Sequence, residues 1–304
     1  MSDRFSQIPR VNVLGVGISA VDLDSATAEI RRWVEEKEKH YVCVTGVHGV
    51  MESQTFEDLR KIHNRSGLTV PDGVPMVWSA RYAGEQTMRQ VRGADLMLRV
   101  LAEANDRGWK SFFYGGKQGV PEQLAEQLSL KLPQLQVAGC YSPPFRELSP
   151  EEDRVVVDLI NASGADLVWI GLSTPKQERW AAAHIDCLDA RVLLAVGAAF
   201  DFHAGLIDEA PRWIQGSGFE WLYRLFKEPG RLWRRYMRNN PLFVMKIVRR
   251  PPSIQTATNQ TKAAGSQLTT RLAVPQSFDG QPGASRPSSP SDTRTSAVDA
   301  KGGL

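Results

Sequence analysis

Short apolar runs alternate along most of the chain with longer segments in which apolar residues recur every three or four positions. The runs predict buried strands, and the longer segments predict amphipathic helices. Strands are predicted at residues 11–18, 40–45, 68–70, 110–114, 136–141, 166–172 and 191–196. Strands separated by helical patterns of about 10–15 residues predict βαβ units. The predicted fold class is therefore α/β, with a mainly parallel sheet and helices on both faces.

The pattern changes at Pro211. From there to residue 250, aromatic and cationic residues are interleaved on helical segments, which Pro229 and Pro241 are expected to interrupt. Such segments predict a C-terminal helical appendage that associates with an anionic membrane surface. Basic aromatic segments also bind nucleic acids, so a noncatalytic nucleic-acid-binding or lipid-binding adaptor is an alternative from another class.

These patterns divide the chain into four parts. They are a polar N-terminal segment (residues 1–10), the α/β core (11–210), the basic aromatic appendage (211–250) and a tail (251–304). The tail is rich in Ser, Thr, Gln, Gly and Pro. Because it has too little apolar surface to offset the entropy lost on ordering, it is predicted to be disordered.

Composition narrows the class of protein. Of the 304 residues, 42% are hydrophobic and 23% charged, which suffices for one large core with an appendage. The formal net charge of +3 is too small to indicate that the whole chain binds nucleic acid. Cys43, Cys140 and Cys187 have no CxxC spacing, which argues against a disulfide or zinc framework and favours the cytoplasm. No stretch approaches the roughly 20 apolar residues of a membrane span, so membrane contact is expected to be peripheral.

One turn is the first candidate for a functional site. Asp72 lies between two prolines and a glycine, directly after the strand at 68–70 and before a predicted helix. This places its carboxylate on a stiff turn at the carboxyl end of a strand, where open α/β sheets bind ligands. Thr45 ends the strand at 40–45 and His48 comes soon after it, so both also fall at the carboxyl end of a strand. The alternatives are a surface turn in which Asp72 caps the next helix, and a packing role for His48.

Two further strand ends carry groups suited to phosphate or sugar. The Gly115-Gly116 pair allows close approach to free backbone N–H groups, although such pairs also simply make tight turns. After the strand at 166–172, Thr174 is expected to cap a helix that Pro175 opens, and Lys176 on its first turn suits a diphosphate. The alternative is a solvated first turn. No complete GxGxxG is present, so a dinucleotide oxidoreductase is poorly supported.

Seven motifs in unbroken order resemble the WecG/TagA/CpsF family, glycosyltransferase family 26. They are Pro71-Asp72-Gly73 with Pro75, Arg92-Gly93-x-Asp95-Leu96, Phe113-Tyr114-Gly115-Gly116, Tyr141-x-Pro143-Pro144-Phe145, Pro175-Lys176-Gln177-Glu178-x-Trp180, Val196-Gly197-x-Ala199-Phe200-Asp201-Phe202, and Glu220-Trp221-Leu222-Tyr223-Arg224-Leu225 running to Glu228-Pro229-x-Arg231. The resemblance covers roughly residues 11 to 245, far more than one short motif gives by chance.

The resemblance implies an inverting, metal-independent glycosyltransferase with a Rossmann-like core, an appendage that completes the site, and no cofactor. It would move a sugar of the N-acetylmannosamine, N-acetylmannosaminuronic acid or glucose type from a UDP-sugar to a polyprenyl-diphosphate-linked saccharide. The place of action would be the cytoplasmic face of the membrane, in cell-surface or exopolysaccharide biosynthesis, with no nucleic-acid partner. The oligomeric state stays open, a homo-oligomer included.

The resemblance also implies roles for individual residues at the matching positions of this sequence. Asp72 matches the family's proposed general base, and Thr45 matches a threonine near it. Arg224, Arg231 and Arg234 match the appendage arginines that the resemblance places on the leaving diphosphate. Their spacing would keep all three on one face of a helix of 3.6 residues per turn, with Pro229 between the first two bending that face. The alternative is that these arginines only attract anionic lipid.

The remaining expected contacts lie on the motifs of the core. The residues expected to bind the UDP-sugar or its diphosphate are Arg92, Gly93, Asp95, Gly115, Gly116, Lys176, Gln177 and Glu178. The chain departs from the resemblance at one loop, where members commonly carry asparagine two residues after the threonine and this sequence has Val47 followed by His48. His48 is therefore a candidate contact to the acceptor or to the donor sugar.

Overall fold

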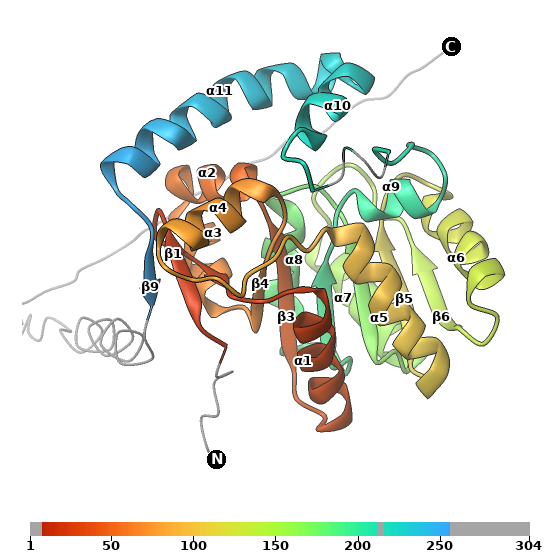
Figure 1. The fold of residues 1–304 in the computed structure, drawn as a ribbon. Coiled ribbons are helices and arrows are strands. Elements are labelled where there is room, and N and C mark those ends of the chain that lie inside the picture. The colour runs from red at the N-terminus through yellow and green to blue at the C-terminus, as the bar shows by residue number, and fades with distance from the viewer. Residues whose placement is uncertain (1–7, 212–213, 215, 256–304) are drawn as a thin grey trace, which may run out of the picture. The chain divides into compact units, whose positions relative to one another are not determined.

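The computed structural model describes residues 8–211, 214 and 216–255. Within them a parallel sheet of six strands has the order β4-β3-β8-β7-β5-β6 (Figure 1). Its strands are β3 (His40–Thr45), β4 (Leu68–Pro71), β5 (Lys110–Gly115), β6 (Gln136–Tyr141), β7 (Leu167–Gly171) and β8 (Val192–Ala195). All neighbouring pairs run parallel, which confirms the predicted α/β class. The strand order differs from the 3-2-1-4-5-6 order of the dinucleotide-binding Rossmann fold.

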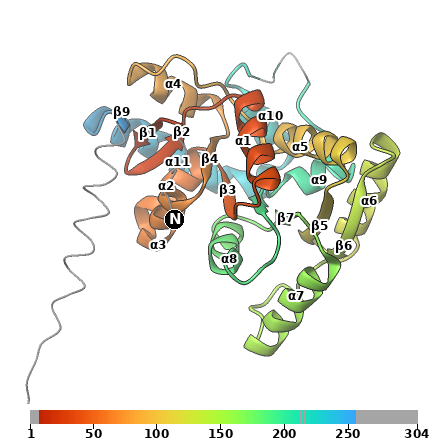
Figure 2. The ribbon, with the colours of Figure 1, turned by 90° about the horizontal axis from the view of Figure 1, so that it is seen from below.

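Helices cover both faces of this sheet. They are α1 (Leu23–Glu35), α2 (Val47–Thr55), α3 (Glu57–Arg65), α4 (Val74–Tyr82), α5 (Gly93–Arg107), α6 (Val120–Lys131), α7 (Pro150–Ser163), α8 (Lys176–His184) and α9 (Ala199–His203). Figure 2 shows α1 and α5 on one side of the sheet and α7 and α8 on the other. Successive strand residues point to opposite faces. Accordingly Trp169 packs in the core with α1 and α5, whereas its neighbours Val168 and Ile170 pack in the core with α7 and α8.

The starts of α7 and α8 are held by different contacts. Ser149 caps α7, because its hydroxyl accepts from the N–H of Glu152 while the side chain of Glu152 accepts from the N–H of Ser149. The expected cap at Thr174 is wrong. Pro175 is the N-cap residue of α8, and the Thr174 hydroxyl donates instead to Glu178 at 2.8 Å.

The strand predicted at 11–18 is in fact a hairpin in a second sheet. β1 (Arg10–Val13) and β2 (Val16–Ser19) pair antiparallel, and β9 (Ser253–Gln255) joins β1 on its other edge. Leu14 and Gly15 both have positive φ, which reverses the chain in two residues, and Asn12 accepts a hydrogen bond from the Gly15 N–H at 2.6 Å. The expected tail at 251–304 thus includes a strand, and its residues from 256 lie outside the described part of the chain.

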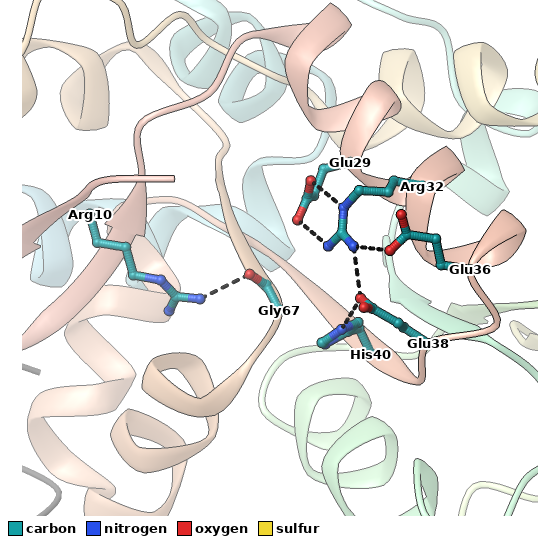
Figure 3. A network of polar contacts seen from close by, with 7 residues as sticks. All are labelled: Arg10, Glu29, Arg32, Glu36, Glu38, His40 and Gly67. Atoms are coloured by element: carbon teal, nitrogen blue, oxygen red, sulfur yellow. Dashed lines mark hydrogen bonds and ion pairs between the residues drawn. The ribbon is translucent and has the colours of Figure 1, made fainter. Parts of the chain in front are cut away.

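Two arginines join elements near the amino ends of strands β3 and β4 of the large sheet (Figure 3). Arg10 donates to the carbonyl oxygens of Ser66 at 2.5 Å and Gly67 at 3.0 Å, which joins the small sheet to the chain entering β4. Burial lowers the pKa of Arg10. Arg32 of α1 pairs with Glu29 on the same helix at 2.9 Å and with Glu38 at 3.1 Å, which joins α1 to the chain entering β3. These contacts lie at the amino ends of the strands and leave the carboxyl ends free to form a site.

Two helices follow the core, α10 (Glu220–Lys227) and α11 (Pro229–Arg249). The predicted interruption at Pro229 is present, but the one at Pro241 is wrong because Pro241 lies inside α11. A proline in a helix costs about 3 kcal/mol, and the packing of Phe243 against the small sheet offsets part of this cost. No helix among the described residues is both long and apolar enough to span a membrane.

Candidate functional site

The carboxyl ends of all six strands of the parallel sheet open into one cleft of about 1300 Å³. The predicted site residues that line it are His48, Asp72, Arg92, Gly93, Gly116, Lys176, Gln177 and Arg224. They come from core loops, from the first turns of α2, α5 and α8, and from α10. Parallel strands place their carboxyl ends at the same edge, so the fold gathers residues that are far apart in the sequence.

Asp72 lies on the turn between β4 and α4. Its N–H donates to the carbonyl oxygen of Thr45 at 2.9 Å, which joins the loops after β3 and β4. Gly46 is needed there because a Cβ atom would collide with the carbonyl oxygen of Asp72. Gly73 has a φ of 105°, which other residues rarely adopt. The turn is therefore held in one conformation from both sides.

The environment of Asp72 makes its carboxylate a stronger base than usual. Burial raises the pKa of the Asp72 carboxyl from 3.8 to about 6. Arg224 and Arg92 lower this pKa, and Glu220 raises it. A carboxyl with a pKa near 6 is mostly ionised at pH 7 and accepts a proton more readily than an ordinary aspartate. Asp72 thus has the properties of a general base.

Thr45 does not reach the cleft through its hydroxyl. Its Oγ1 is buried 2.6 Å from Nε2 of His63, and Nδ1 of His63 lies 2.9 Å from the carbonyl oxygen of Leu59. Because a carbonyl only accepts, Nδ1 carries the ring proton and the Thr45 hydroxyl donates to Nε2. Burial lowers the pKa of His63 to about 4, so the ring is neutral at pH 7. Gly49 lies between this pair and the cleft, where a Cβ would be 3.0 Å from Cγ2 of Thr45.

Arg92 is held at the cleft by two carboxylates. Its guanidinium pairs with Glu209 and lies 3.4 Å from Asp95 on the first turn of α5. Asp95 itself does not line the cleft. Gly93 lies between them in sequence and approaches β8, since a Cβ there would be 3.1 Å from the carbonyl oxygen of Val196.

Arg224 is the arginine of α10 that reaches the cleft. Its guanidinium carbon lies 5.5 Å from the ring centroid of Phe202, a cation–π distance. Its buried Nε has no hydrogen-bond partner among the described residues. The expectation of one helical face shared with Arg231 and Arg234 is wrong, because these two residues belong to α11. Arg234 is exposed and does not line the cleft, and the side chain of Arg231 lies outside the described part of the structure.

Of the remaining candidates, Gln177 lies in the wall of the cleft, whereas Glu178 and Gly115 do not line it. Gln177 donates to Glu178 Oε1 at 3.1 Å, while Glu178 is fully buried and burial raises its pKa. Gly115 is a packing residue, since a Cβ there would lie 2.6 Å from the carbonyl carbon of Gly171 on β7. Lys176 and Gly116, by contrast, face the cleft. Among the residues that the structure describes, no group of three or more His, Cys, Asp or Glu is arranged to hold a metal.

Comparison with known proteins identifies the family to which this chain belongs. The model of the Glycosyl transferase WecG/TagA/CpsF family matches residues 11–256. The chain belongs to this glycosyltransferase family. A protein of Bacillus subtilis (strain 168) is 24% identical over 237 residues, which cover 75% of this chain and 90% of the relative. One of Bacillus spizizenii is 29% identical over 180 residues, 59% of this chain and 67% of the relative. Both are named N-acetylglucosaminyldiphosphoundecaprenol N-acetyl-beta-D-mannosaminyltransferase.

Membership makes the chain an enzyme, a glycosyltransferase in a family that depends on UDP-sugars. It replaces the alternative of a noncatalytic adaptor. His48, which follows Val47 in the loop where this chain departs from the quoted motifs, lines the cleft and contacts the appendage. The side-chain amide of Asn239 on α11 donates to its Nδ1 at 3.1 Å, and Glu52 lies 3.8 Å from the same nitrogen.

Sequence reasoning missed one wall of the glycosyltransferase cleft. Trp180 lines it and stacks between Tyr114 and His184, with ring centroids 4.2 Å away on each side. Asp153 of α7 accepts from His184 Nε2 at 2.9 Å and thereby holds the stack. Tyr114 and Trp180 stand in the quoted motifs, one near the end of β5 and the other on the helix that follows β7, so an aromatic residue after each of two neighbouring strands could have located this wall.

Proposed function

We propose that this glycosyltransferase moves a sugar, with inversion, from a UDP-sugar to a saccharide linked to polyprenyl diphosphate. The observation that supports it most is the Asp72 carboxylate, with a pKa of about 6, in a cleft that also holds Arg92 and Arg224. The names of the two relatives favour N-acetylmannosamine as the transferred sugar, ahead of its uronic acid or glucose. They also favour undecaprenyl-diphosphate-linked N-acetylglucosamine as the acceptor.

The proposed reaction needs a base and a stabilised leaving group. Asp72 removes the proton from the attacking hydroxyl of the acceptor as its oxygen bonds to the anomeric carbon of the donor. The bond from that carbon to the diphosphate breaks on the opposite face, and UDP leaves with its electron pair. Guanidinium groups pair bidentately with phosphate, so Arg224 and Arg92 are suited to offset the developing charge. We place Lys176 on the same diphosphate, and Arg231 with Arg224. The N–H of Gly116 already donates to the carbonyl oxygen of Gly171 at 2.9 Å, so this glycine contributes only close approach to the ligand.

The buried candidates take supporting roles in this proposal. The hydrogen bond from Thr45 to His63 fixes the loop whose carbonyl oxygen receives the Asp72 N–H. Asp95 orients Arg92, and Glu178 orients Gln177 toward the donor. We keep His48 as a contact to the acceptor or the donor sugar.

We further propose that the enzyme acts at the cytoplasmic face of the membrane through residues 211–250. Phe226 and Trp233 are exposed there among arginines, as in segments that lie in anionic lipid interfaces. In this proposal Arg234 meets lipid rather than the substrate. In detergent micelles, Arg224→Ala should still lower turnover, whereas a double replacement of Arg249 and Arg250 by alanine should cost little. Equal, small losses would restrict the role of Arg224 to membrane attraction.

One experiment tests the proposed function directly. The purified chain is given a panel of UDP-sugars with a short-chain prenyl diphosphate carrying N-acetylglucosamine, and products are identified by mass and by anomeric configuration. We expect one added sugar with inverted configuration, formed roughly 10²–10⁴-fold more slowly by the Asp72→Asn variant. A product with retained configuration, or no product from any donor, would refute the proposal.

A further inference from the structure

The cleft has a second, apolar part formed by α4 and α11. Trp78 and Tyr82 lie one turn apart on α4, and Val244 and Val248 lie one turn apart on α11, so each pair shares a helix face. All four line the cleft, although Trp78 is 57%, Tyr82 74% and Val248 77% exposed. A contiguous patch of exposed, large apolar side chains is typical of a binding surface.

This apolar part is continuous with the reaction centre. α4 begins two residues after Asp72, and Asn240 of α11 lines the same cleft as Asp72 and Arg224. From Asn240 to Val248, α11 runs about 12 Å at 1.5 Å per residue. In Figure 1, α11 extends above α2 and α4, away from α10, which carries Arg224. The cleft is thus polar and charged where Asp72 lies and apolar toward the end of α11.

A ligand that matches both parts has an anionic head and a hydrocarbon tail. The polar part of the cleft holds Arg92, Lys176 and Arg224, so it favours an anionic head. We propose that α4 and α11 form a groove that binds the first isoprene units of the acceptor's polyprenyl chain. The proposal rests on the proposed function and adds the part of the enzyme that would recognise the lipid carrier.

The groove predicts a preference that can be measured without a bilayer. Two soluble acceptors carry the same saccharide diphosphate, one on a farnesyl chain and one on a butyl chain. The wild type should have the lower KM for the farnesyl acceptor. Trp78→Ser, Tyr82→Ser and Val248→Ser should each reduce the KM ratio between the two acceptors about tenfold, the effect of losing one or two buried CH₂ groups. Leu130→Ser on α6, equally exposed but outside the cleft, should keep the wild-type ratio.

The outcomes distinguish a prenyl groove from a surface that only meets the bilayer. An unchanged ratio in all three groove variants, or no farnesyl preference in the wild type, would overturn the groove and leave the transfer reaction standing. Losses seen only with lipid vesicles would also overturn it and assign the surface to the bilayer. If the wild type transfers to neither acceptor, the proposed function fails. Calorimetric binding of the farnesyl acceptor to wild type and Val248→Ser then decides the groove by itself.

Discussion

Replacing Asp72 by asparagine should remove activity and at the same time stabilise the fold. The shape of the side chain is nearly kept while the basic oxygen is lost, so kcat should fall by roughly 10²–10⁴-fold, the usual effect of losing a general base. The stability effect follows from the pKa of Asp72, which is raised from 3.8 to about 6 by burial. A raised carboxyl pKa means that ionisation is less favourable in the folded chain than in the unfolded one.

The size and the pH range of this stabilisation can be worked out. A shift of about two pKa units corresponds to about 3 kcal/mol, an upper bound because Asp72 is partly exposed. The cost of ionisation is absent below about pH 4, grows between pH 4 and 6, and is constant above pH 6. Asp72→Asn should therefore raise the free energy of unfolding at pH 7 and leave it nearly unchanged at pH 4 or below.

Urea unfolding of both proteins at pH 7 and pH 4, together with kcat for the preferred donor, measures both effects. Asp158→Asn, an exposed carboxylate on α7 outside the cleft, is the matched control and should change neither quantity. Near-wild-type turnover of Asp72→Asn would remove Asp72 from the mechanism. Equal or lower stability of the variant at pH 7 would show that the carboxylate is better compensated in the folded chain than its burial and two arginines indicate.

Three further predictions concern the same site and the ends of the chain. The pH profile of kcat/KM should fall on the acid side with a pKa of about 6, and Arg224→Gln should move this limb to higher pH because Arg224 lowers the Asp72 pKa; an unmoved limb would contradict the pairing. Thr45→Val should cost about 1–3 kcal/mol in urea unfolding, because it leaves His63 without its buried donor, and Thr45→Ser should restore most of it; equal stability of both variants would argue against the bond. Deleting residues 256–304 should leave turnover and Tm nearly unchanged, whereas deletion from residue 251 also removes β9 from β1 and should lower Tm; equal Tm values would show that β9 is dispensable.

Local sequence patterns determined the parallel core of this protein. Apolar runs of four to six residues favour buried strands, and helical repeats between them supply the crossovers that keep such strands parallel. The cap of α7 could be predicted because Ser149 and Glu152 satisfy each other's backbone groups within one turn. The position of Asp72 followed from the stiff Pro-Asp-Gly turn. These features depend on neighbours in the sequence and are therefore visible in it.

What the side chains of the site do was decided by the tertiary structure. Thr45 and Asp72 both follow strand ends, yet His63, brought beside β3 by α3, turns the Thr45 hydroxyl away from the cleft. The high pKa of Asp72 depends on burial and on Arg224, which belongs to a helix far along the chain. Burial, charge pairing and the continuity of a groove depend on which distant segments meet. A periodic pattern contains no information about that, so only the folded chain could supply it.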